Sequence, residues 1–142
     1  MRGERAKRPQ SAAALWSRLA ELGFSPLLPA GVDPVVFVQR LGDRIRHVDA
    51  KDGEFVAHSA ARSGLLAHGA WDRRDRGFRF RISGWGDVRW RALLTELPLT
   101  GYDYVLAAEH GDATMSRKDG VEKAISFFGP LRIQGPFEGR WW

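Results

Sequence analysis

The segment over residues 104–128 constrains the fold of this chain more than any other. Residues 104–110 read YVLAAEH, a short apolar run that ends in a carboxylate and an imidazole. Residues 116–128 follow as an amphipathic segment, with Ser116 and Asp119 in the positions of a helix-capping box. This order predicts one strand–loop–helix unit, the building block of parallel α/β folds. In such folds the chemistry lies where strands end and loops begin, so the end of the 104–110 run is the first candidate site.

A second stretch has the same character. Residues 44–49 read RIRHVD and end a short predicted strand over residues 45–49. His47 and Asp49 are two residues apart on that strand, so their side chains should share one face. Because consecutive strand–helix units pair side by side, we expect Asp49 and Glu109 to lie close together at neighbouring strand ends. Two such ends could together hold a divalent metal ion.

The remaining elements follow from periodicity and from capping residues. Asp33 and Asp87 are expected helix N-caps, and Pro98 is expected to stop a helix. His58 and His68 are expected at the surface, and residues 53–76 give a poor signal. Helices are predicted over residues 11–22, 33–42, 88–97 and 116–128, and strands or extended segments over residues 45–49, 78–82 and 104–108. The Gly84-Trp85-Gly86 turn is expected to serve the packing of Trp85 and Trp90.

Length and composition narrow the class of protein. At 142 residues the chain is long enough for one domain with a core and too short for two ordinary domains. We divide it into a basic, disordered tail over residues 1–10 and one domain over residues 11–142. It has no cysteine, which excludes disulfides and thiolate metal sites. No apolar run approaches the roughly 20 residues of a membrane span, so we expect a cytoplasmic protein with no membrane partner.

The charge admits two interpretations. The net charge is +5, the isoelectric point is near 10.2, and arginine supplies most of the positive charge. Arginine suits bidentate phosphate contacts, so a phosphate or nucleic-acid partner is one interpretation. A solvated, arginine-rich surface is the other, and the interleaved acidic residues favour it. A nucleic-acid partner is therefore not expected.

Three ordered blocks carry a family resemblance. They are GVDPVVFVQRLGDRIRHVDAKDGEF over residues 31–55, FRFRISGWGDVRWRALL over residues 78–94 and GYDYVLAAEHGDATMSRKDGVEKAISFF over residues 101–128. From about Phe24 to Phe128 the chain resembles the sugar phosphate isomerase/epimerase proteins, the xylose isomerase-like TIM barrels. The resemblance implies an α/β fold that comprises the C-terminal strand–helix units of a TIM (β/α)8 barrel. A complete barrel needs roughly 200–250 residues, so this one is expected to be incomplete.

The resemblance also implies roles for residues. Glu109 begins EHGD, which matches an EHED-like run whose first acidic residue is a metal ligand, and His110 follows it as a substrate contact. Asp49 stands in HVDAKD where the family has a ligand histidine in HVHAKD. In the same run, His47 and Lys51 take catalytic positions, Lys51 as a group that could polarise a substrate oxygen or hold a phosphate. Arg81 matches a position that edges the substrate pocket. The implied cofactor is a divalent metal ion, Mn, Mg, Co or Zn.

The sequence departs from the family pattern upstream. The family has an FDPSH-like strand end before the first block, and its aspartate is another ligand. Here Ser25 stands at the aspartate position, and the Ser-His pair is missing. A fourth ligand, a glutamate on an earlier strand, has no counterpart in this sequence. We therefore expect metal binding to be weak or lost.

Two functions remain open from the sequence. The first is a sugar or sugar phosphate isomerase or epimerase of carbohydrate metabolism, with metal-assisted proton transfer next to a sugar carbonyl. The second is a catalytically inactive remnant that self-associates or binds a partner protein. In either case an incomplete barrel leaves an open sheet edge, which we expect a homo-oligomer or a partner protein to cover. Phosphate or nucleic-acid binding ranks last, because charge alone suggests it.

Overall fold

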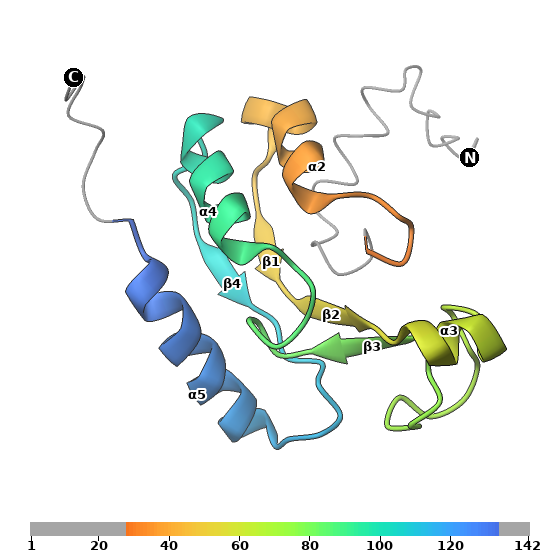
Figure 1. Cartoon of the computed structure of the whole chain (residues 1–142). Coiled ribbons are helices and arrows are strands. Elements are labelled where there is room, and N and C mark those ends of the chain that lie inside the picture. Colours follow the sequence, from red (N-terminus) through yellow and green to blue (C-terminus); the bar gives the residue numbers. More distant parts are fainter. Residues whose placement is uncertain (1–27, 134–142) are drawn as a thin grey trace, which may run out of the picture.

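A computed structural model of the chain describes residues 28–133 (Figure 1). The elements are helix α2 (Pro34–Leu41), the 3-10 turn η1 (Gly42–Arg44), strands β1 (Val48–Ala50) and β2 (Asp52–Phe55), helix α3 (Ala57–Ser63), strand β3 (Phe78–Arg81), helix α4 (Trp90–Leu99), strand β4 (Leu106–Ala108), helix α5 (Arg117–Phe128) and the 3-10 turn η2 (Gly129–Leu131). The predicted tail over residues 1–10, the predicted helix over residues 11–22 and Ser25 lie outside the described residues.

Strands β1 and β4 form a two-stranded parallel sheet. Val48 pairs with Leu106 and Ala50 pairs with Ala108, although 58 residues separate the partners. The parallel pairing of the two predicted strand ends is thus confirmed. The predicted strand over residues 45–49 begins later than expected and ends one residue later, at Ala50. Parallel strands require a crossover, and α4 lies on that connection (Figure 1).

A second, antiparallel sheet extends from the end of β1. Strand β2 pairs with β3 in the register Asp52 to Arg81 and Phe55 to Phe78. Strand β3 confirms the extended segment that was predicted over residues 78–82. Strand β2 was not predicted, because most of it belongs to residues 53–76, where the sequence gives a poor signal. The connecting residues include α3, whose His58 is exposed, as is His68 after it, in agreement with the prediction for both histidines. The structure therefore joins a parallel pair and an antiparallel pair rather than a run of parallel strands only.

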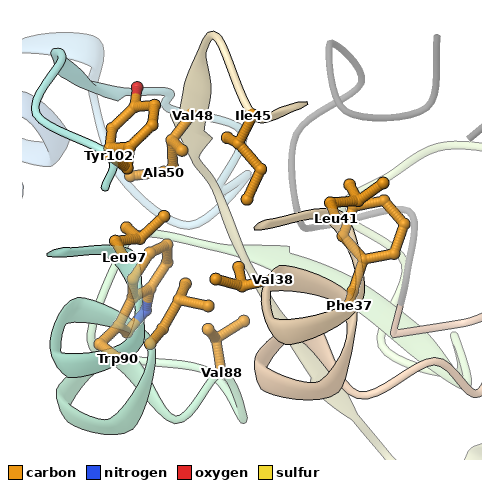
Figure 2. Close-up of a cluster of buried hydrophobic side chains, with 11 residues drawn as sticks. Phe37, Val38, Leu41, Ile45, Val48, Ala50, Val88, Trp90, Leu97 and Tyr102 are labelled. Carbon is orange, nitrogen blue, oxygen red and sulfur yellow. The ribbon is translucent and has the colours of Figure 1, made fainter. Parts of the chain in front are cut away.

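The hydrophobic core lies between α2, α4 and β1 (Figure 2). Val38 of α2 and Leu93 of α4 are fully buried, and Val48 and Ala50 of β1 face them from the sheet. The core side chains are Phe37, Val38, Leu41, Ile45, Val48, Ala50, Val88, Trp90, Leu93, Leu97 and Tyr102. Both helices thus cover one face of the parallel pair, and Asp49 lies on the opposite face of β1.

Three of the predicted helices lie within the described residues, and the starts of two of them agree with the prediction. The Asp33 carboxylate accepts a hydrogen bond from the Val35 N–H at 2.9 Å, with Pro34 in the first turn of α2. The Ser116 hydroxyl accepts from the Asp119 N–H at 3.2 Å at the start of α5. Helix α4 differs, because it begins at Trp90 rather than Val88 and includes Pro98. The Asp87 carboxylate accepts from the Phe55 N–H of β2 at 2.6 Å, so Asp87 binds the neighbouring sheet and does not cap α4.

The described residues form a mixed α/β fold with few, short strands and no closed barrel. Within residues 28–133, no helix combines the length and apolarity that a membrane crossing requires.

Candidate functional site

The candidate site lies on the face of the β1–β4 sheet that the core helices leave open. Side chains alternate along a strand, so the burial of Val48 and Ala50 towards the helices places Asp49 on the opposite face. Asp49 pairs with Ala107, and Glu109 lies two residues beyond Ala107. The Glu109 N–H donates to the Ala50 carbonyl at 3.2 Å, which continues the ladder past β4. Asp49 and Glu109 are therefore on one face of neighbouring strands, as the sequence predicted.

A short ion pair joins the two strand ends. The Lys51 Nζ donates to Glu109 Oε1 at 2.5 Å. The Lys51 ammonium also lies 4.4 Å from the ring centroid of Phe80, and its side chain is only 17% exposed, against 46% for Glu109. A Cβ on Gly111 would come within 2.6 Å of Lys51 Cε, so a glycine at this position leaves room for the lysine stem. Lys51 is thus held in place, while its carboxylate partner faces solvent.

His47 and Asp49 form a second pair on the same face. The His47 Nε2 and Asp49 Oδ1 atoms are 2.9 Å apart, and both side chains are partly exposed. The imidazole is thus a hydrogen-bond partner of the carboxylate. The two predicted catalytic residues, His47 and Lys51, are therefore each paired with one of the two predicted metal ligands.

Arg81 lies between two carboxylates at the adjoining edge of the antiparallel sheet. Its Nε is 3.6 Å from Glu54 Oε2 and 3.5 Å from Asp112 Oδ2, and the side chain is 16% exposed. Burial by itself raises the pKa of Asp112, but hydrogen bonds from Thr114 and from the Ile82 N–H, together with the Arg81 charge, outweigh it and leave that pKa below its usual value. Arg81 is thus mainly a partner of these two acids, with little surface left for a substrate.

His110 lies against helix α5. A Cβ on Gly120 would come within 2.6 Å of the His110 ring, so only the missing side chain of Gly120 lets the ring approach the helix. The His110 Nδ1 is buried and has no hydrogen-bond partner among residues 28–133. The ring is therefore packed behind the strand end, and its contact with a substrate stays a prediction.

Asp52 makes an extensive set of contacts that the sequence did not predict. It is fully buried, and its carboxylate accepts hydrogen bonds from the N–H groups of Gly53, Gly84, Gly86 and Val88 and from Trp90 Nε1, at 2.8–3.2 Å. One side chain thus fixes the turn between β3 and α4 to the start of β2. The available signal was an acidic residue beside Gly53 with a later Gly-x-Gly turn, which is too general to indicate this contact.

The two tryptophans of this turn have different environments. Trp90 is 2% exposed and belongs to the core, as expected. Trp85 is 51% exposed, so the prediction that it serves packing is wrong. The Arg81 guanidinium lies 5.6 Å from the centroid of its ring, and the Lys123 ammonium lies 5.8 Å from it. The two glycines around Trp85 bind Asp52 through their N–H groups, which turns the indole outwards.

The two carboxylates can supply part of a metal site. Mg²⁺ and related cations are often bound through one or two carboxylates together with water and substrate oxygens. Asp49 and Glu109 fit this pattern on one face of adjacent strands. Within residues 28–133, no group of three or more His, Cys, Asp or Glu side chains is placed to hold a metal ion. In the structure Asp49 is paired with His47 and Glu109 with Lys51, so metal binding by the two carboxylates stays a prediction.

Comparisons with known proteins add one similarity. No family model matches the chain. The chain is 30% identical over 104 residues to the uncharacterized protein YfiH of Bacillus subtilis (strain 168). The aligned region covers 71% of this chain and 33% of YfiH. The chain thus spans about a third of the length of the relative that it matches.

Proposed function

We propose that the chain is a relative of the sugar phosphate isomerase/epimerase proteins, and that its described strands and helices correspond to C-terminal strand–helix units of a TIM barrel. Its reaction would be proton transfer next to the carbonyl of a sugar or sugar phosphate in the cytoplasm. The observation that carries the proposal is the Lys51–Glu109 pair, which joins the ends of two neighbouring parallel strands. Functional residues of parallel α/β folds lie at that edge.

The pair offers an acid and a base for this chemistry. An ammonium group beside a sugar carbonyl can hydrogen-bond the oxygen as negative charge develops on it. The partly exposed Glu109 carboxylate can accept a proton from the neighbouring carbon. Because Lys51 is held by Phe80 and by the space at Gly111, its ammonium has a fixed position relative to the base.

Asp49 and Glu109 would hold a divalent metal ion if one binds. Such an ion would polarise substrate oxygens and so assist the same proton transfer. His47 would orient Asp49 through their hydrogen bond. Glu109 would have to share its charge between the ion and Lys51, and with only two carboxylate ligands we expect weak binding of Mn²⁺.

The test is exchange of substrate hydrogen with solvent. The wild-type protein is incubated in D2O with aldoses, ketoses and their phosphates, with and without Mn²⁺, and deuterium at the carbon next to the carbonyl is measured by NMR. We expect exchange in the wild type and its loss in Glu109→Gln, which keeps the shape of the side chain and removes its charge. The control is Glu122→Gln, which changes an exposed glutamate of α5.

Titration calorimetry with Mn²⁺ separates the metal from the reaction. We expect weak binding by the wild type, none by Glu109→Gln, and stronger binding by Asp49→His, which restores the ligand type that the resemblance implies. If no substrate exchanges hydrogen under any of these conditions, the catalytic proposal fails. The alternative, a catalytically inactive module that associates through its open sheet edge, then becomes the better account.

A further inference from the structure

Helices α4 and α5 lie on either side of strand β4 (Figure 1). Residues of these three elements line an apolar groove. Its volume is about 630 Å³. Its lining comes from α4, the loop before β4, β4 itself, α5 and the residues after α5, and it includes Leu97, Tyr104, Leu106, Ile125 and Phe128. Apart from one acidic and one basic residue, this lining consists of apolar and aromatic residues and one glycine.

Strand β4, which lines the groove, also has one unpaired edge. Among the described residues β4 pairs with β1 alone, so the backbone groups of its other edge have no strand partner there. Ile125 is 65% exposed and Tyr104 is 62% exposed at this edge. Exposed apolar side chains beside an unpaired strand form a surface that proteins in water normally cover.

The two charged residues of the groove come from different segments of the chain. Asp103 lies between α4 and β4, and Arg132 follows η2 after α5. Both are exposed, and neither forms an ion pair with any residue in the range 28–133. A groove with one unpaired charge of each sign is complementary in charge to a copy of itself.

We propose that this groove is the interface of a homodimer, and that its occupant is a second copy of the chain. In a two-fold symmetric interface the same surface is used on both sides. Ile125 and Tyr104 of one copy would enter the groove of the other, and Arg132 of each copy would meet Asp103 of its partner. The β4 edges would be covered in the same step. This proposal is independent of the proposed catalysis, because the groove lies on the helix side of the sheet.

The first test measures mass in solution. Light scattering of the purified full chain should give a dimer that dissociates on dilution. Ile125→Glu places a charge in the groove and should raise the dissociation constant about 10-fold or more. The matched control is Val36→Glu, which changes an exposed valine of α2 outside the groove and should leave the dimer intact.

The second test exchanges the charges. Asp103→Arg and Arg132→Asp should each weaken the dimer, because each places like charges opposite one another. The double variant should restore it. Mixing the two single variants should also give a heterodimer, since two Arg–Asp contacts then form.

Two results would overturn the proposal. One is a wild-type protein that stays monomeric at about 1 mM. The other is a dimer that neither Ile125→Glu nor the charge reversals affect, because another surface would then form it. A wild-type monomer that binds a different protein through this groove would likewise refute the second copy as occupant.

Discussion

Asp49 and Asp52 lie three residues apart, yet their surroundings assign them different tasks. Asp49 is partly exposed, with one hydrogen bond to His47, and can therefore face a ligand. Asp52 is fully buried, and five N–H donors surround its carboxylate. Buried charge is tolerated only where hydrogen bonds compensate it, so Asp52 serves the fold rather than the reaction.

Replacement of Asp52 should therefore affect stability strongly. Asp52→Ala leaves several buried N–H groups without an acceptor, and we expect a loss of ~3 kcal/mol or more in the free energy of unfolding. Denaturant titration followed by tryptophan fluorescence measures the loss, with Asp72→Ala, at an exposed aspartate, as the control. A change of less than about 1 kcal/mol would show that the turn does not depend on this carboxylate.

Asp112 should make stability depend on acid pH. Its pKa is lower in the folded protein than in the unfolded chain, so its contribution is complete above the unfolded value of about 3.9 and disappears as the pH falls through the lowered pKa. We expect the stability difference between wild type and Asp112→Asn to be largest at neutral pH and to shrink below about pH 4. Urea titrations over this range measure it. A difference that stays constant down to the acid limit would contradict the assignment.

At the scale of elements, features that depend on neighbouring residues were predicted correctly, whereas features that depend on long-range contacts were not. The cap of α2 at Asp33 and that of α5 at Ser116 depend on neighbouring residues, and both are found. The start of α4 failed because the Asp87 carboxylate accepts from Phe55, 32 residues away in the sequence. Strand β2 was missed because residues 52–55 read DGEF, with poor strand propensity, and pairing with β3 decides their conformation.

The turn before α4 gives a test of this long-range contact. A Cβ on Gly86 would lie 2.3 Å from Asp52 Oδ1 and 2.4 Å from the Gly53 carbonyl oxygen. Gly86→Ala should therefore force the turn away from Asp52 and cost ~2–3 kcal/mol in unfolding free energy. The control is Gly129→Ala, where a Cβ meets nothing within 4 Å and φ is −49°. Thermal unfolding followed by circular dichroism compares them, and equal melting temperatures would refute this account of the turn.

For the whole molecule, the sequence predicted the relative positions of Asp49 and Glu109 better than it predicted the complete set of strands. Parallel neighbouring strands with Asp49 and Glu109 on one face follow from alternation and from the strand–helix order. The partner of Glu109 could not be predicted in this way, because Lys51 lies 58 residues from Glu109 in the sequence. The exposure of Trp85 was also not predictable, since it results from the hydrogen bonds of Gly84 and Gly86 to Asp52. The antiparallel β2–β3 pair could not be predicted either, because β2 was not recognised as a strand.

The open edge of β4 leads to a prediction about the whole molecule. If two copies must meet to cover it, folding and association are linked, and the melting temperature should rise with protein concentration. For a dimer of this chain length we expect about 2–3 °C for each tenfold increase. Calorimetric scans at several concentrations measure the shift. Ile125→Glu should melt at lower temperature and lose the dependence, whereas Val36→Glu should keep it. A wild-type melting temperature that is the same at every concentration would mean that the fold of this chain does not depend on a second copy.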